Sequence, residues 1–157
     1  MKMLIDADAC PVVDICIDCA GKHDMPVWLI CDTAHQMDRD GASTIVVTRG
    51  ADSADFRLVN LIQPGDLVIT QDYGLAAMSL ARKARVLHQS GMRYTDDNID
   101  SLLLARHTAR KVRMAGGRMR GPAKRTRTED EAFRAALLTL LREEPQPTAG
   151  SPASPDA

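Results

Sequence analysis

Two aspartates, Asp6 and Asp8, directly follow the first apolar run of the chain at residues 3–5. The run has the length of a short buried strand, and the Pro11 just beyond it is typical of a first helical turn. If the strand continues to Asp8, both carboxylates project from the same side of the sheet and repel each other. Such a pair requires a cation or a shared proton, which indicates a binding site at the strand end. The alternative is that Asp8 caps the next helix and that Asp6 is a solvated strand end.

Three further aspartates stand where predicted helices begin. Asp52 and Asp55 are three residues apart after the third predicted strand, and Asp72 follows the fourth. Because the ends of the first and fourth strands lie near each other in the expected fold, we expect these side chains to meet Asp6 and Asp8 at one rim of the sheet. The alternative for each of the three is helix capping, which stabilises a helix by about 0.5–2 kcal/mol.

A rim of this kind has the chemistry of a hard-cation site. Its candidate ligands are carboxylates, which Mg²⁺ and Mn²⁺ prefer. The site suits hydrolysis of a phosphodiester by water that the cation activates. The four histidines show no spacing that pairs them with these acids, so the sequence gives them no role. The predicted metal ligands are Asp6, Asp8, Asp52, Asp55 and Asp72.

The order of apolar runs and turn residues predicts five strands with helices between most of them. The strands are expected at residues 3–5, 26–31, 44–48, 67–70 and 85–88, and the helices at residues 11–20, 52–62, 73–83, 99–106 and from Thr128 onward. This alternation predicts a three-layer α/β/α fold around a mostly parallel sheet of about five strands. We expect a single domain over residues 1–143, followed by a disordered Pro/Ser/Ala-rich tail over residues 144–157.

Charge is distributed unevenly, because nine of the 20 Lys and Arg residues fall within residues 106–127, which contain no acid. The rest of the chain has eleven basic and 21 acidic residues, a net charge of −10. This asymmetry indicates a cation site in one place and an anion-binding segment in another. Such a segment could bind the phosphates of a nucleic acid; the alternative is a solvated, partly mobile loop. The predicted contacts are Arg110, Lys111, Arg113, Arg118, Arg120, Lys124 and Arg125.

The sequence also predicts where the protein is found. No stretch approaches the roughly 20 apolar residues of a membrane span, and the N-terminus lacks the features of a signal peptide. We therefore expect a cytoplasmic protein, not bound to membranes, whose cysteines are thiols. Cys16 and Cys19 fall inside a predicted helix, where buried hydrophobes explain them better than a redox or zinc motif. Cys10 lies beside Asp6 and Asp8, whose charges disfavour a nucleophilic thiolate. No pattern indicates an oligomeric state.

The opening Asp6-Ala7-Asp8-Ala9-Cys10-Pro11 resembles that of the YaiI/YqxD family, a group of uncharacterised bacterial proteins related to PIN-like nuclease domains. Several later segments are also similar to family motifs. The resemblance extends over residues 1–142 and implies a PIN-like α/β/α fold. The similar segments are residues 50–55 and 65–72, Tyr94-Thr95 with Asn98-Ile99, and Gly121-Pro122 followed by Asp130 and Phe133.

PIN-like nucleases place acids after the first strand, at the start of a central helix and after a later strand. Asp6 or Asp8, Asp55 or Asp52, and Asp72 match these positions. The resemblance therefore implies hydrolysis of RNA with Mg²⁺ or Mn²⁺. Its predicted catalytic residues are Asp8 and Asp72 as ligands, and Asp55 as a ligand or a base that orients water.

The sequence leaves two other interpretations of its function open. One is a non-catalytic RNA-binding or regulatory module that keeps the acidic rim for structure. The other is a phosphatase similar to the haloacid dehalogenases, in which Asp6 is the nucleophile and Asp8 the acid/base. That family expects Thr or Val where Cys10 stands, and a later lysine followed by paired acids, which the sequence does not supply convincingly.

Overall fold

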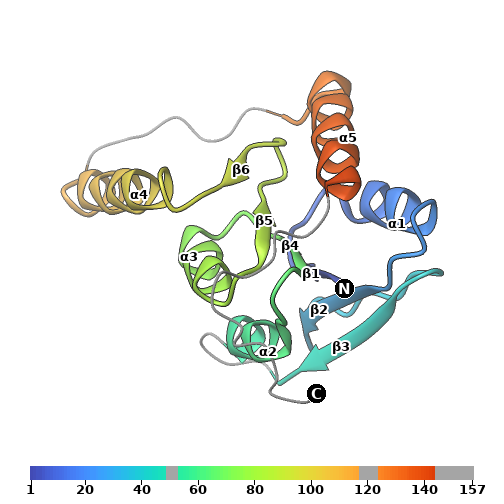
Figure 1. Cartoon of the computed structure of the whole chain (residues 1–157). Helices are drawn as coiled ribbons and strands as arrows, with labels where there is room; N and C mark the ends of the chain where they lie inside the picture. Colours follow the sequence, from blue (N-terminus) through green and yellow to red (C-terminus); the bar gives the residue numbers. More distant parts are fainter. Residues whose placement is uncertain (49–52, 117–123, 144–157) are drawn as a thin grey trace, which may run out of the picture.

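The computed structural model describes residues 1–48, 53–116 and 124–143. The described residues form six strands and five helices (Figure 1). The strands are β1 (Met3–Asp6), β2 (Val27–Asp32), β3 (Ser43–Val47), β4 (Leu67–Ile69), β5 (Arg85–Leu87) and β6 (Arg93–Tyr94). The helices are α1 (Val13–Gly21), α2 (Ser53–Leu61), α3 (Tyr73–Ala81), α4 (Ile99–Met114) and α5 (Arg127–Arg142).

All six strands belong to one sheet, in the order β3-β2-β1-β4-β5-β6. The first five are parallel, and only β6 pairs in the antiparallel direction, along β5. β1 lies at the centre, where Leu4 is opposite Trp28 of β2 and Val68 of β4. The strand order reverses at β1, and open α/β sheets bind their ligands in the crevice beyond the strand ends at such a point.

Helices cover both faces of the sheet, which confirms the predicted three-layer α/β/α fold (Figure 1). Ile5 faces a core built with α1 and α5, and it packs in one cluster with Phe133 and Leu137. Leu4 faces the opposite core with α2, α3 and the start of α4. Because side chains alternate along a strand, Asp6 projects on the Leu4 side, toward α2 and α3.

Cysteines contribute to the first of these cores. Cys16 and Cys19 are fully buried in α1, which confirms their interpretation as small core residues. All four cysteines are free thiols. Burial, with a smaller effect from Asp6, raises the pKa of Cys10 to about 11, so this thiol stays protonated near neutral pH.

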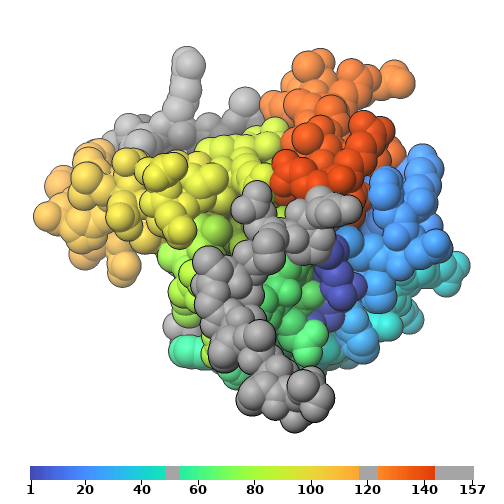
Figure 2. Space-filling model, in the orientation of Figure 1, coloured from blue at the N-terminus to red at the C-terminus, as the bar shows by residue number. Residues whose placement is uncertain are grey.

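Element boundaries differ from the predicted ones mainly at the basic segment. α4 continues to Met114, eight residues beyond its predicted end at Arg106. Its added turns consist mostly of Ala, Arg, Lys and Met, which are strong helix formers, and Lys111 and Arg113 lie at the negative end of the helix dipole. Residues 106–114 of the basic segment are therefore helical, and α4 extends away from the sheet (Figures 1 and 2).

Smaller differences occur elsewhere. α1 begins at Val13 rather than at Pro11. α5 begins at Arg127, because the Thr126 side chain accepts a hydrogen bond from the Glu129 N–H and caps the helix there. The predicted tail lies outside the described residues. None of the helices in the described part of the chain is long and apolar enough to cross a membrane.

Candidate metal centre at the carboxyl edge of the sheet

Four of the predicted acids lie around the carboxyl end of β1. Asp6 is the last residue of β1, and Asp8 follows in the turn beyond it. Asp55 lies in the first turn of α2, and Asp72 directly precedes α3. Burial raises the pKa of Asp6 to about 7, and the charges of Asp55, Asp8 and Asp72 each contribute to this rise. Asp6 therefore lies within electrostatic range of the other three acids, and the four lie around one end of β1.

Thr70 connects two of these acids. This buried residue follows β4, and its hydroxyl donates a hydrogen bond to Asp6 Oδ2 at 3.0 Å. The same hydroxyl oxygen accepts a bond from the Asp72 N–H at 3.0 Å. The Tyr94 hydroxyl, itself buried, donates to the carbonyl oxygen of Thr70 at 3.3 Å. These bonds hold the end of β4 against the end of β1, so they fix the relative positions of Asp6 and Asp72.

Asp72 caps α3 while facing the same site. Its Oδ1 accepts hydrogen bonds from the N–H groups of Gly74 at 2.8 Å and Leu75 at 3.1 Å. Arg106 of α4 donates to this oxygen at 3.3 Å. The capping role that the sequence left as an alternative is therefore real. Each of these contacts uses Oδ1, so Oδ2 is the oxygen through which Asp72 would bind a cation.

An open pocket of about 410 Å³ lies at this edge, and we call it the acidic pocket. Its volume is within the range of small-ligand sites. Arg106, about half exposed, is its positively charged wall. Tyr73 lines the pocket, and its ring meets the buried Tyr94 ring edge-on at 5.9 Å. The lining residues are Asp6, Asp8, Gln71, Asp72, Tyr73 and Arg106.

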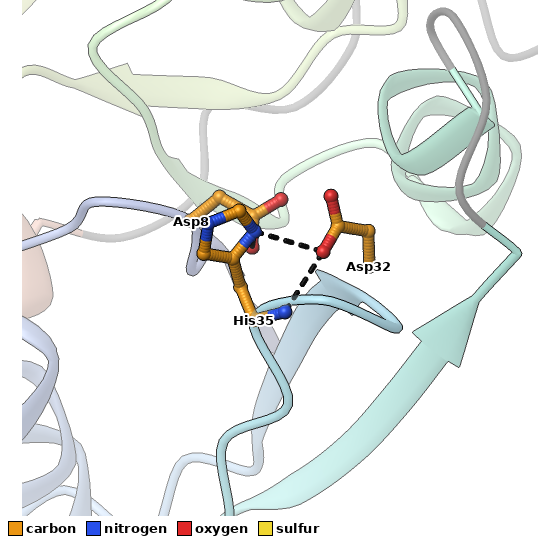
Figure 3. Close-up of side chains that lie close together, drawn as sticks. All are labelled: Asp8, Asp32 and His35. Atoms are coloured by element: carbon orange, nitrogen blue, oxygen red, sulfur yellow. Dashed lines mark hydrogen bonds and ion pairs between the residues drawn. The ribbon is translucent and has the colours of Figure 1, made fainter.

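Asp8 also belongs to a second group of side chains, which it forms with Asp32 and His35 (Figure 3). Asp32 ends β2, the neighbour of β1, and accepts hydrogen bonds from the His35 N–H and from His35 Nδ1, each at 2.9 Å. The ring bond from His35 lowers the pKa of Asp32. His35 Nδ1 is also 3.8 Å from Asp8 Oδ1. We call Asp8, Asp32 and His35 the mixed-donor cluster.

Sequence reasoning missed Asp32, His35, Thr70 and Arg106. Asp32 follows the second apolar run as Asp6 follows the first, so the argument from strand ends would have found it. Thr70 shares that signal, since it is the last residue of the fourth predicted strand, at residues 67–70. Arg106 carries no such signal, because its position depends on how α4 packs on α3. His35 lies in the connection after β2, and only the structure relates it to Asp8.

The predicted basic contacts separate into three groups. Arg110, Lys111 and Arg113 are exposed on α4, and Lys124 is exposed before α5. Arg125 is mostly buried, since it pairs with Asp130 and donates to the Gln89 carbonyl at 2.8 Å, so it anchors the start of α5. The predicted ligand Asp52 and the predicted contacts Arg118 and Arg120 lie outside the described residues.

These features define an α/β protein with an acidic pocket at the reversal point of a mostly parallel sheet. The chain belongs to the YaiI/YqxD family, since the family model described as "Uncharacterized BCR, YaiI/YqxD family" matches residues 4–143. The resemblance seen in the sequence motifs is thereby confirmed. The match includes every described residue of the acidic pocket and of the mixed-donor cluster.

Curated relatives are similar over nearly their whole length. A UPF0178 protein of Exiguobacterium sibiricum is 52% identical over 143 residues, which are 91% of this chain and 98% of the relative. A UPF0178 protein of Ruminiclostridium cellulolyticum is 50% identical over 145 residues, 92% of this chain and 94% of the relative. One from Clostridium acetobutylicum is 48% identical over 143 residues, 90% and 97% of the two chains. No solved structure shows significant similarity to the chain.

Proposed function

We propose that the protein is a divalent-cation-dependent phosphodiester hydrolase that acts on RNA at the acidic pocket. One observation carries the proposal: burial, together with the charges of three other acids, Asp55, Asp8 and Asp72, raises the pKa of Asp6 to about 7. Burial and the neighbouring carboxylates both disfavour the charged form of Asp6. A divalent cation would supply a compensating positive charge and displace the proton.

The donor set fits Mg²⁺ or Mn²⁺. The acids around the pocket offer carboxylate oxygens, the ligands that hard cations prefer. Asp6, Asp8 and Asp72 all line the pocket, so their carboxylates can reach an ion bound in it. In the proposal Asp8 and Asp72 hold the cation with Asp6, and Asp55 holds it or orients water. When bound, the cation supplies positive charge to the phosphate oxygens and promotes deprotonation of water.

The chain's own residues position the substrate. Arg106 lies on the pocket wall and is half exposed, so its guanidinium can bind an entering phosphate in place of Asp72. Beyond Arg106, α4 presents Arg110, Lys111 and Arg113 to solvent. These cations continue away from the pocket along one helix, which suits the regularly spaced phosphates of a polynucleotide. An RNA strand would thus contact α4 and place one phosphodiester in the acidic pocket.

A second candidate function is RNA binding without turnover. The exposed basic half of α4, residues 106–114, favours it because this surface binds phosphates whether or not the pocket is catalytic. The two functions differ in one respect. Binding by α4 alone does not require a divalent cation, whereas hydrolysis at the pocket does.

Cleavage of end-labelled single-stranded RNA in Mn²⁺ or Mg²⁺ tests the proposal. The variants are Asp8→Asn and Asp72→Asn, with Asp100→Asn as a control because Asp100 is an exposed acid of α4. We expect the first two to slow cleavage at least about a hundredfold, the scale of losing one electrostatic contact to a transition state, and the control to cleave normally. RNA binding with no cation-dependent cleavage by the native chain would favour the second function.

A further inference from the structure

We infer that Asp8, Asp32 and His35 form a second cation site, which takes a borderline transition ion such as Zn²⁺ rather than Mg²⁺. This mixed-donor cluster shares Asp8 with the acidic pocket but is built from the β2 side of β1, whereas Asp72 of the pocket follows β4 on the other side. The inference does not depend on hydrolysis of RNA. It concerns which ion binds beside the pocket and which residues hold it.

Strand register brings the two carboxylates together. Asp6 of β1 is paired with Ile30 of β2, and the Ala7 N–H donates to the Ile30 carbonyl at 3.0 Å. Asp8 and Asp32 each stand two residues beyond this pair, so both emerge from the same edge of neighbouring strands. The turn after Asp32 then carries the His35 ring over the pair. The cluster therefore combines two parts of the chain that the sheet itself aligns.

The distances suit one small ion. His35 Nδ1 is 2.9 Å from Asp32 Oδ1 and 3.8 Å from Asp8 Oδ1, and all three ligand atoms lie within 4.8 Å of one another. A tetrahedral Zn²⁺ with bonds of about 2.0–2.2 Å needs ligand atoms about 3.4 Å apart. Small side-chain adjustments would place the three atoms around such an ion.

The Asp8 carboxylate provides an independent indication of a ligand. Its Oδ1 is buried, yet it receives no hydrogen bond from the described residues, and His35 Nδ1 is too distant to supply one. A buried polar atom without a partner commonly marks a bound ion or water. Figure 3 shows this carboxylate beside the His35 ring. The unpaired oxygen is also the Asp8 atom that lies 3.8 Å from His35 Nδ1.

Donor chemistry selects the class of ion. An imidazole nitrogen suits Zn²⁺, Co²⁺ and related ions, whereas Mg²⁺ favours a shell of oxygens. Three protein ligands leave a fourth position of a tetrahedral ion open to water or to a substrate atom, as in catalytic zinc sites. The His35 side chain is 59% exposed, so an ion can enter from solvent.

Ion binding must also move a proton. A carboxylate only accepts hydrogen bonds, so in the cation-free protein His35 Nδ1 carries a proton and donates it to Asp32 Oδ1. An ion at the cluster binds the Nδ1 lone pair, which leaves the ring proton on Nε2. This change of tautomer is specific to an ion bound through Nδ1.

Zn²⁺ titration of the ¹⁵N-labelled full chain, followed through the histidine ring nitrogens, tests the inference. We expect one equivalent of Zn²⁺ to move the His35 proton from Nδ1 to Nε2. Calorimetry should show binding weakened at least about tenfold in His35→Ala and Asp32→Asn. The amide oxygen introduced by Asp32→Asn can still accept the two backbone N–H bonds of this turn, so this variant is expected to fold. His107→Ala, an exposed histidine of α4, is the matched control and should bind Zn²⁺ as the native chain does.

Two further measurements separate this site from its neighbours. Co²⁺ bound at the cluster should give visible absorption without the near-ultraviolet band of thiolate ligation, because its ligands are nitrogen and oxygen. Asp72→Asn changes a residue of the acidic pocket that is not among the cluster's ligands, so it should leave Zn²⁺ affinity within about threefold of native. Unchanged Zn²⁺ affinity in His35→Ala, a thiolate band, or loss of Zn²⁺ binding in Asp72→Asn would each overturn the inference. Loss of Mn²⁺ binding alone in Asp72→Asn would support separate sites.

Discussion

The Thr70 hydroxyl donates a hydrogen bond to Asp6 Oδ2 at 3.0 Å, and this contact joins the ends of two neighbouring parallel strands. Thr70 is nearly fully buried, and its oxygen also accepts the Asp72 N–H. The Thr70 side chain thus binds both the carboxylate of Asp6 and the backbone N–H of Asp72, a second acid of the pocket. The acidic pocket is part of the sheet's own hydrogen-bonded framework rather than a loose group of surface carboxylates.

Thr70→Val is expected to disturb this arrangement without changing side-chain volume. The bond from Thr70 lowers the pKa of Asp6, so its loss should raise that pKa further above 7. Because the Asp72 N–H also loses its acceptor, the free energy of unfolding should fall by about 1–3 kcal/mol. Carboxyl ¹³C NMR titration and urea unfolding measure the two effects. Thr70→Ser keeps the hydroxyl and should restore both values; an unshifted Asp6 in Thr70→Val would contradict the account.

Asp6 should make stability depend on pH in a defined direction. Its pKa is 3.8 for an unperturbed carboxyl and about 7 in the folded chain, so between about pH 4 and 7 the folded state holds a proton that the unfolded state has lost. The free energy of unfolding therefore falls as pH rises through this window, by at most about 4 kcal/mol. The stabilisation is fully present below about pH 4 and lost above about pH 7.

Asp6→Asn removes this titration and tests its source. The variant should be more stable than the native chain at about pH 8, and its melting temperature should change less between about pH 4 and 8. The physical reason is that an amide needs no proton to remain neutral in a buried position. Calorimetric melting of both proteins across this pH range measures the effect. Parallel pH profiles would show that Asp6 is ionised in the folded chain at all these pH values.

Asp72 should have separable structural and ligand roles. Asp72→Ala removes the cap on the Gly74 and Leu75 N–H groups and should destabilise the chain by about 0.5–2 kcal/mol. Asp72→Asn keeps a capping oxygen and should cost less, because Asn is a good N-cap residue. Urea unfolding of the two variants gives the comparison. Equal destabilisation by Ala and Asn would mean that the charge, not the cap, stabilises α3.

The basic half of α4 should account for the salt dependence of RNA binding. Replacing Arg110, Lys111 and Arg113 with Gln is expected to reduce the slope of log K against log salt by about 2, since each phosphate contact to a single strand contributes about 0.7. Binding of labelled RNA at several salt concentrations, without divalent cations, measures this slope. A matched control replaces three exposed cations elsewhere, Arg57, Arg82 and Lys83, and should leave the slope nearly native. Equal losses in both triple variants would indicate a general charge effect.

The sequence was sufficient to predict the layers of the fold and the meeting of the acids. Met3, Leu4 and Ile5 form an apolar run, and such runs mark strands buried on both faces, which predicted β1 and its neighbours. The carboxyl ends of parallel strands meet at one edge of a sheet, so Asp6, Asp8 and Asp72, which follow two of these strands, are expected together at that edge. The short strand β6 was not predicted, because two residues carry no periodic signal.

Contacts that depend on packing between distant elements could not be predicted in this way. Arg106 reaches Asp72 only because α4 packs on α3, and no local pattern encodes that pairing. His35 meets Asp8 through a turn whose course the sequence leaves open. The length of α4 was underestimated because its second half has no buried face, so helix propensity rather than hydrophobic periodicity maintains it.

The central claim is that Asp8 and Asp72, 64 residues apart, hold one cation at a preformed site. Calorimetric titration of Mn²⁺ into the native chain, Asp8→Asn, Asp72→Asn and the control Asp100→Asn at about pH 7 tests it most directly. We predict saturable binding with proton release for the native chain and the control, and affinity at least about tenfold weaker in each of the other two. No binding to the native chain at millimolar Mn²⁺, or native affinity in both Asp8→Asn and Asp72→Asn, would contradict the claim.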